Sequence, residues 1–130
     1  MAVNGSGVVA VRGEQYLTKR TQFGLVYEEG STWVSKAVVI KALPNGLNLS
    51  RCGFTVSRRV GKAVVRNRVK RLLREILRQT LLRPGWDIIF IARSSAARDN
   101  YASLGKSVKG LLLQAGLLVG EYEGVCPRTN

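Results

Sequence analysis

The chain has 130 residues, and 45% of them are hydrophobic, which is enough apolar material for one folded domain with a single core. It carries 21 lysines and arginines against 8 aspartates and glutamates, a formal net charge of +13, and it has no histidine. This excess of positive charge favours a polyanionic partner, nucleic acid above all. The lack of histidine removes the commonest general base and metal ligand, so the side chains are poorly equipped to catalyse a reaction themselves.

The composition also argues against a membrane protein or a secreted one. No apolar run approaches the roughly 18–20 residues of a membrane-spanning helix, and the N-terminus does not have the pattern of a secretory signal. The cysteines, Cys52 and Cys126, are far apart and fit no metal or redox spacing. We therefore expect a cytoplasmic protein with no membrane association, no disulfide and no metal held by its own side chains.

The first predicted element is a short helix with two aromatic residues. Residues 1–13 are glycine-rich and are expected to form a flexible arm, and residues 15–29 are expected to form a helix that stops at Gly30. Phe23 and Tyr27 are four residues apart, so their rings would share one helix face. Aromatic pairs at this spacing usually belong to a core, but such rings also form stacking platforms for bases. The pattern alone leaves both interpretations open.

Two strands are predicted next. Residues 33–43 are rich in β-branched side chains, and residues 49–57 alternate between two faces. Pro44-Asn45-Gly46 between them is a strong turn signal, so the two strands are predicted to pair as a hairpin. Gly53 in the second strand would let another backbone or a ligand approach one face of the sheet.

The segment from Arg58 to Arg78 holds most of the positive charge. Nine basic residues less one acid, Glu75, give it +8 of the total of +13. Apolar residues from Val65 to Ile76 recur at the spacing of one helix face, so a helix with one buried and one basic face is predicted, extending to about Leu82. A charged helix face is often only a solvated face, but such faces usually mix both signs. Here the near absence of acids favours a surface that binds phosphates.

The last elements are a buried strand and an amphipathic helix. Residues 86–93 are almost continuously apolar, which is typical of a central strand covered on both faces. A helix is predicted from Tyr101, capped by Asp99 or Asn100, and residues 119–130 are expected to form a flexible tail.

The predicted order over residues 14–118 is α-β-β-α-β-α. This order predicts a single α+β domain, a small α/β sandwich.

The run from Gly53 to Arg74, GFTVSRRVGKAVVRNRVKRLLR, resembles the signature of the protein subunit of bacterial ribonuclease P. In that signature a strand ends in serine and two basic residues, and a glycine precedes a helix that contains Arg-Asn-Arg. The aromatic pair of the first helix, the DIIFIAR strand and the last helix are weaker marks of the same family. The similarity covers about residues 14–118.

The resemblance implies a ribosomal-protein-like sandwich whose βαβ crossover through the basic helix is left-handed, an exception to the usual right-handed rule. It also implies that the chain is the non-catalytic partner of a large catalytic RNA, which removes the 5′ leader of precursor tRNA. The implied partners are ribonuclease P RNA and precursor tRNA, with no dedicated protein partner. The implied cofactor is Mg²⁺, held mainly by the RNA and the substrate.

The resemblance further implies two surfaces. The basic helix and the loop before it would contact the catalytic RNA, and a cleft between that helix and the sheet would take the single-stranded leader. Phe23 and Tyr27 would line this cleft. Related proteins often carry an aromatic in the first strand, but residues 37–41 have none, so Lys41 is expected to contact a phosphate there, with Trp33 as a weaker alternative. The residues assigned to RNA binding are Arg58, Arg59, Lys62, Arg66, Asn67, Arg68, Lys70, Arg71 and Arg74.

Three other functions are alternatives, and a structural RNA-binding protein is the main one. A structural RNA-binding protein of ribosomal type would also need a basic helix, but it would not distinguish precursor tRNA with a leader from mature tRNA. A DNA-binding protein would read base edges. The basic helix face offers mostly arginine and lysine, and Asn67 is its one amide suited to recognising adenine. A nuclease acting by itself would need acid–base groups that the chain lacks.

Overall fold

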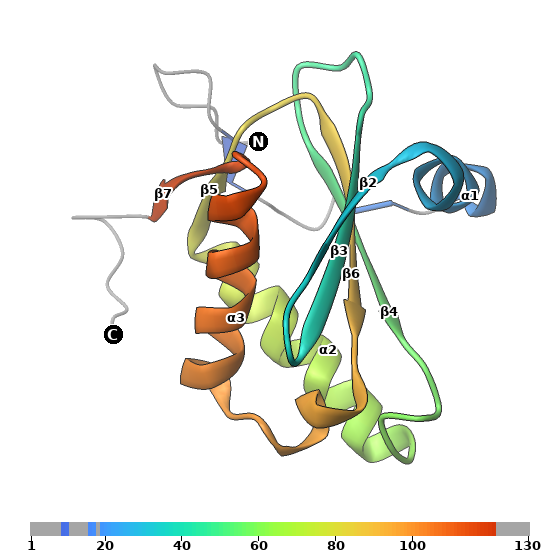
Figure 1. Ribbon diagram of the computed structural model, residues 1–130, viewed down its shortest axis with the longest axis vertical. Helices are drawn as coiled ribbons and strands as arrows, with labels where there is room; N and C mark the ends of the chain where they lie inside the picture. The colour runs from blue at the N-terminus through green and yellow to red at the C-terminus, as the bar shows by residue number, and fades with distance from the viewer. Residues whose placement is uncertain (1–8, 11–15, 18, 122–130) are drawn as a thin grey trace.

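The computed structural model describes residues 9–10, 16–17 and 19–121, which form an α/β sandwich with three layers (Figure 1). A four-stranded sheet is the middle layer, with helix α1 on one face and helices α2 and α3 on the other. The helices are α1 (Arg20–Glu29), α2 (Ala63–Arg78) and α3 (Tyr101–Gln114). The sheet strands, in spatial order, are β2 (Ser31–Val34), β3 (Val38–Pro44), β6 (Trp86–Ala92) and β4 (Arg51–Val56).

Strand β6 occupies the centre of the sheet, and the predicted hairpin is therefore wrong. β6 pairs antiparallel with β3 and parallel with β4, so it separates the two strands that the turn at residues 44–46 joins. The turn itself is confirmed, because Asn45 accepts a hydrogen bond from the Leu47 amide at 2.8 Å. β6 takes the central place because it is apolar on both faces, with Phe90 and Ile89 both fully buried. β4 and β6 run parallel, and the chain connects them through α2. The left-handed sense of this crossover stays a prediction.

The predicted strand 33–43 is divided into β2 and β3 by a tight turn. The Ser35 amide donates to the Val38 carbonyl at 2.8 Å, and the Ser35 hydroxyl bonds to both backbone groups of Val38. The segment contains no glycine or proline, so the turn had no strong signal in the sequence.

The basic helix ends earlier than predicted, because the residues that follow it form a short strand. α2 ends at Arg78, and Thr80–Leu82 forms β5, whose Thr80 hydroxyl donates to the Ile76 carbonyl at 2.8 Å. β5 is the middle strand of a small second sheet, between β1 (Val9–Ala10) and β7 (Leu118–Glu121). These two strands lie in or beside the segments predicted to be flexible, and the rest of those segments lies outside the described residues.

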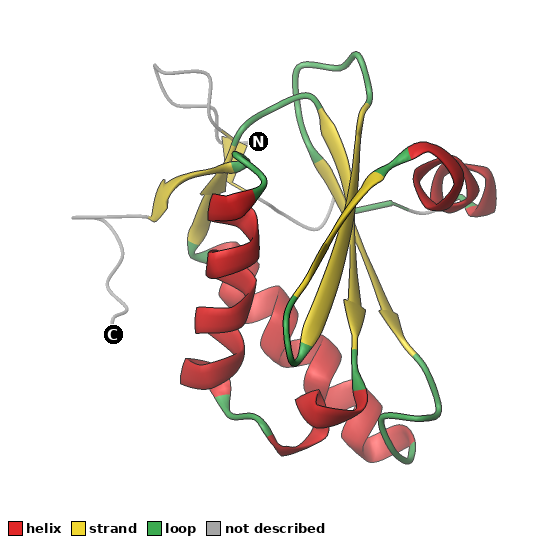
Figure 2. Cartoon of the chain, viewed as in Figure 1, coloured by secondary structure: helices red, strands yellow, loops and turns green. Residues whose placement is uncertain are grey.

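Helix α3 is capped as expected. Asn100 accepts a hydrogen bond from the Ser103 amide at 2.8 Å, and the Ser103 hydroxyl accepts one from the Asn100 amide at 3.2 Å. Figure 2 shows the short helical turn η2 (Ser94–Arg98) between β6 and α3.

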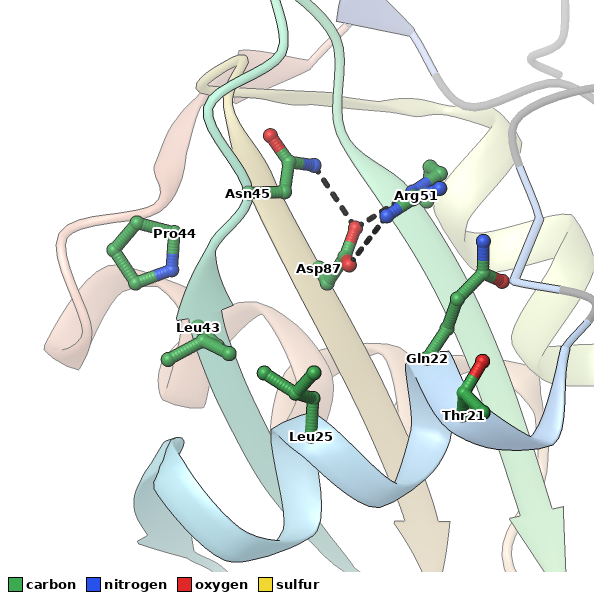
Figure 3. Close-up of a pocket in the computed structure, with 8 residues that line it drawn as sticks. All are labelled: Thr21, Gln22, Leu25, Leu43, Pro44, Asn45, Arg51 and Asp87. Atoms are coloured by element: carbon green, nitrogen blue, oxygen red, sulfur yellow. Dashed lines mark hydrogen bonds and ion pairs between the residues drawn. The ribbon is translucent and has the colours of Figure 1, made fainter.

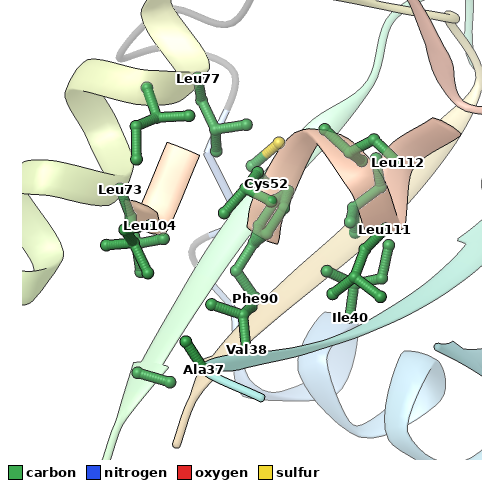
Figure 4. Packing of buried hydrophobic residues seen from close by; sticks show 14 of the residues in the cluster. Ala37, Val38, Ile40, Cys52, Leu73, Leu77, Phe90, Leu104, Leu111 and Leu112 are labelled. Atoms are coloured by element: carbon green, nitrogen blue, oxygen red, sulfur yellow. The ribbon is translucent and has the colours of Figure 1, made fainter. Parts of the chain in front are cut away.

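The main core fills the space between the sheet and the pair α2 and α3 (Figure 4). Ile40, Cys52 and Phe90 from three adjacent strands pack there against Leu73 of α2 and Leu112 of α3. Burial of each large side chain of this kind stabilises the fold by about 1.5–3 kcal/mol. Cys52 is buried in this core, and burial raises the pKa of its thiol.

A smaller core lies on the opposite face, where Val26 of α1 and Leu17 cover Ile89. Helix α1 therefore sits over the middle of the sheet. This placement leaves the edge strand β4 exposed along one flank of α1, which is where the candidate site lies.

Candidate nucleic-acid interface

Helix α2 presents a continuous basic surface to the solvent, as its periodicity predicted. Val69, Leu73, Ile76 and Leu77 are buried beneath it. Among the described residues, Glu75 forms an ion pair with Arg78 at 3.1 Å, and no ion pair involves the other cations of the helix. We call the outward-facing polar residues of α2 the basic face; they are Asn67, Lys70, Arg71 and Arg74.

The loop before α2 adds three exposed cations, Arg58, Arg59 and Lys62. The loop turns sharply at Gly61, whose φ of +156° lies at the limit of the region that favours glycine. The Arg66 guanidinium donates to the Gly61 carbonyl at 3.1 Å, so Arg66 closes the loop onto the helix. Arg66 therefore has a structural contact as well as its predicted role in binding.

Arg68 points away from the basic face. Its guanidinium donates to the Ala97 carbonyl at 3.3 Å and to the Asp99 carbonyl at 2.6 Å, so it fastens α2 to the segment that leads into α3. A step of about 100° per residue places it on the flank of the helix opposite Lys70 and Arg74. The structure therefore separates Arg68 from the other residues assigned to RNA binding.

A pocket of about 220 Å³ lies at the exposed edge of β4, between α1 and α2. Lys70 and Arg74 of α2 form one side of it, and the ring of Phe23 from α1 forms another. The structure therefore brings an aromatic ring and two cations to one hollow. We call this hollow the edge pocket; its lining residues are Tyr16, Leu17, Phe23, Cys52, Gly53, Phe54, Lys70 and Arg74.

Phe23 reaches the edge pocket because Gly53 has no side chain. A Cβ atom at position 53 would lie 2.6 Å from two carbons of the Phe23 ring, which is closer than atoms can approach. The close approach predicted at this glycine is thus made by a side chain of the same protein. Phe23 is partly buried, and it both packs on the smaller core and lines the pocket.

Tyr27 stands one helical turn further along α1 and is 40% exposed. Its hydroxyl lies 2.8 Å from the hydroxyl of Thr55 on β4, which fixes the ring above the edge strand. Phe23 and Tyr27 therefore both contact the same short stretch of β4, as expected for two rings on one helix face.

Lys41 and Trp33 are not brought to this pocket. Lys41, Ile89 and Gly53 face the same side of the sheet in one row across three strands, and the buried Ile89 under α1 lies between the other two. The Lys41 ammonium donates to the Thr32 hydroxyl at 2.8 Å, toward the opposite edge of the sheet. Trp33 packs against the main core, on the other face of the sheet.

A second pocket of about 260 Å³ lies beside the first turn of α1 (Figure 3). At its base Arg51 donates to both oxygens of Asp87, at 2.8 and 2.7 Å, and Asn45 donates to the same carboxylate at 2.9 Å. The hydrogen bond to Asp87 raises the pKa of Arg51. This network neutralises its own charges and ties β4 and the turn after β3 to β6, so we assign it to the fold.

Two residues of the edge pocket were not singled out from the sequence, Tyr16 and Phe54. The alternation of residues 49–57 placed Phe54 on the same face as Cys52 without assigning it a role. Tyr16 fell inside the helix predicted over residues 15–29, but α1 begins only at Arg20 and Tyr16 instead forms a bridge with Cys52. Both lie at the border of the sheet, where a side chain contacts the core and the surface together. That placement depends on which strand is at the edge, which the residue pattern did not reveal.

Within the described part of the chain, no three His, Cys, Asp or Glu side chains are grouped closely enough to hold a metal ion. No helix of that part is long and apolar enough to cross a membrane.

Comparison with known proteins identifies the family. The ribonuclease P family model matches residues 11–116. The chain belongs to the ribonuclease P protein family. The ribonuclease P protein component of Dehalococcoides mccartyi is 51% identical over 102 residues, which are 78% of this chain and 85% of that relative. The component from Caldanaerobacter subterraneus subsp. tengcongensis is 42% identical over 103 residues, covering 78% of this chain and 89% of the relative.

A solved structure agrees with this assignment. The ribonuclease P protein of Thermotoga maritima matches 76% of this chain and 96% of its own length, with a TM-score of 0.69 and 30% identity. The predicted α+β sandwich of the ribonuclease P family is therefore confirmed, together with the family resemblance of the Arg-Asn-Arg segment.

Proposed function

We propose that this chain is the protein subunit of a ribonuclease P, which binds the catalytic RNA and the 5′ leader of precursor tRNA in the cytoplasm. The observation that carries the proposal is the edge pocket, which Phe23 lines together with Lys70 and Arg74. Stacking rings beside a basic groove are the usual means of holding a single strand with little sequence preference. Leaders differ among precursor tRNAs, so a site of this kind suits them.

In this proposal, different residues of α2 and its preceding loop contact the leader and the catalytic RNA. Lys70 and Arg74 line the edge pocket, whereas Arg71 and the exposed cations Arg58 and Arg59 of the preceding loop face the solvent. A leader in the pocket would thus lie along the same helix that docks on the catalytic RNA. Holding both in register lowers the entropy cost of bringing the scissile phosphate to the RNA.

The chemistry in this proposal belongs to the RNA. The protein would supply orientation and positive charge, which reduces the repulsion between two polyanions. Mg²⁺ would be held mainly by the RNA and the substrate, where it activates water and stabilises the leaving oxygen. The protein would then lower the Mg²⁺ concentration that cleavage requires.

The test is cleavage of precursor tRNA by a bacterial ribonuclease P RNA at low Mg²⁺, with and without the protein. We expect the protein to restore cleavage at the mature 5′ end and to favour precursors with a leader over mature tRNA in binding. A variant with Phe23→Leu should lose part of that preference while it still assembles with the RNA. If the protein binds the RNA but changes neither cleavage nor leader preference, it is a structural RNA-binding protein instead.

A further inference from the structure

We propose that Tyr16 stacks on one nucleobase of the single-stranded leader in the edge pocket, and so acts as a further binding residue for the substrate. This inference rests on the proposed function and adds a residue that belongs neither to the Arg-Asn-Arg motif nor to the aromatic pair Phe23 and Tyr27. It is carried by the position of the ring, its support from the core, its unused hydroxyl and the cations beside it.

The Tyr16 ring is the outermost of three rings that lead from the core to the pocket. Its centroid lies 5.6 Å from that of Phe54 at an angle of 62°, and Phe54 lies 5.9 Å from the fully buried Phe90. Edge-to-face pairs of this kind are favourable and hold both rings in one orientation. Tyr16 is only partly buried and lines the open pocket, so one part of the ring is left for another partner.

The backbone of Tyr16 and Leu17 is fixed to the edge of the sheet. Tyr16 forms a parallel bridge with Cys52, and the Leu17 amide donates to the Cys52 carbonyl at 2.8 Å. A ring that is already held in place loses little conformational freedom when a ligand binds, so more of the stacking energy appears as affinity.

The hydroxyl of Tyr16 has no hydrogen-bond partner among the described residues. By contrast, the Tyr27 hydroxyl is bonded to Thr55 at 2.8 Å. Burial raises the pKa of Tyr16, and the charges of Arg74 and Arg78 oppose that effect, so the hydroxyl lies within the field of the basic helix. A neutral hydroxyl there is free to donate to or accept from a nucleotide.

The two cations beside Tyr16 are positioned to bind the phosphates of the leader. Lys70 and Arg74 line the same pocket as Tyr16, and no acid is among its lining residues. A ring for the base with cations for the flanking phosphates is the arrangement expected for an unpaired nucleotide. With a volume of about 220 Å³ between two helices, the pocket has room for a single base rather than a duplex.

The experiment scans the leader with abasic nucleotides in the complete complex of protein, ribonuclease P RNA and precursor tRNA. With the wild-type protein, we expect an abasic nucleotide at one leader position to weaken binding by about 5- to 150-fold, the size of one stacking contact. Tyr16→Leu should weaken binding of the intact precursor by a similar factor and remove the penalty at that one position. Tyr16→Phe, which keeps the ring, should restore the penalty.

Tyr101→Leu is the matched control, because Tyr101 is an exposed ring on α3 and lies away from the pocket. It should leave the abasic profile unchanged. An unchanged profile in Tyr16→Leu would overturn the inference and leave the proposed function standing. If the wild-type complex shows no preference for a leader at all, the proposed function fails, and the inference fails with it.

A second measurement uses only the wild-type protein, in case Tyr16→Leu does not fold. A photoreactive nucleotide is placed at the leader position where the abasic penalty is largest, and the crosslinked peptide is identified by mass spectrometry. We expect the crosslink on the peptide that contains Tyr16. A crosslink confined to other segments would overturn the inference.

Discussion

Phe23 lies against the edge strand because position 53 has no side chain. The Cβ of any other residue there would meet the Phe23 ring at 2.6 Å, and the Leu17 side chain at 3.2 Å. Since Leu17 belongs to the smaller core, the ring has little room to retreat inward. The shape of the edge pocket therefore depends on one missing methyl group.

At the residue scale, we expect Gly53→Ala to destabilise the protein by about 1–3 kcal/mol, the usual cost of overpacking. The displaced Phe23 ring should also reduce the preference for precursors with a leader, whereas affinity for the RNA subunit stays the same. Urea unfolding and binding of leader-bearing against leaderless tRNA measure the two effects.

Gly24→Ala is the control for this substitution. Gly24 lies in the exposed part of α1, and a Cβ atom there would meet nothing within 4 Å. It should stabilise the helix by up to about 1 kcal/mol, because alanine has the higher helix propensity. Equal leader preference in Gly53→Ala and the wild type would show that the position of Phe23 is unimportant.

At the scale of elements, α2 carries two arginines in different surroundings. Arg68 fastens it to the carbonyls of Ala97 and Asp99, whereas Arg71 is exposed and has no ion pair among the described residues. The two arginines are three residues apart and have the same chemistry. They therefore form a matched pair for separating stability from binding.

We expect Arg68→Ala to lower the free energy of unfolding by about 1–3 kcal/mol, because it leaves two backbone carbonyls without their donor. Arg71→Ala should hardly change stability, but it should weaken RNA binding and reduce the slope of log affinity against log salt by about 0.7–0.9, the loss of one phosphate contact. Urea unfolding and filter binding over a salt series test both. An equal loss of salt slope in both variants would place Arg68 on the RNA as well.

Most helices and strands could be predicted from the sequence, but the order in which the strands pair in the sheet could not. The 3.6-residue period of α2 and the apolar run of β6 come from local burial, so the sequence carries them directly. The insertion of β6 between β3 and β4 depends on contacts more than thirty residues apart, which no local pattern specifies. Because the edge strand was unknown, Tyr16 and Phe54 were not recognised as pocket residues.

Which of the predicted site residues come together also depends on how the elements pack, which the sequence pattern does not specify. Phe23 was assigned to the leader cleft, whereas Lys70 and Arg74 were assigned to the RNA-binding helix, and the structure brings the three into one pocket that Tyr27 does not line. Lys41 was expected near them, but the row of residues across the sheet places α1 and Ile89 between Lys41 and Gly53. Arg68 belongs to the motif and yet binds the protein itself, a distinction that requires knowledge of where η2 lies.

At the scale of the whole molecule, the formal net charge of +13 opposes folding by self-repulsion. Within the described residues, the salt bridges are Arg51–Asp87 and Arg78–Glu75, so most of the cations have no ionic partner. The folded protein should therefore be stabilised by anything that screens or binds these cations.

We expect the unfolding temperature to rise by several degrees between about 0.05 and 0.5 M salt, where the screening length becomes much shorter. A short polyphosphate should produce a similar rise at far lower concentration, because binding to the folded state stabilises it by mass action. Thermal unfolding followed by circular dichroism measures both, with an uncharged osmolyte at equal concentration as the control. A temperature that does not depend on either anion would mean that repulsion contributes little.

The central position of β6 also determines when the protein can fold during synthesis. β3 and β4 each have their main partner in residues 86–92, so they cannot complete the sheet until that segment has left the ribosome. Until then α2 has no complete sheet to pack against, and its basic residues are part of an unfolded chain. A nascent chain in which residues 86–92 are still inside the ribosome should therefore attract RNA only through charge, and selective binding should begin once β6 has emerged.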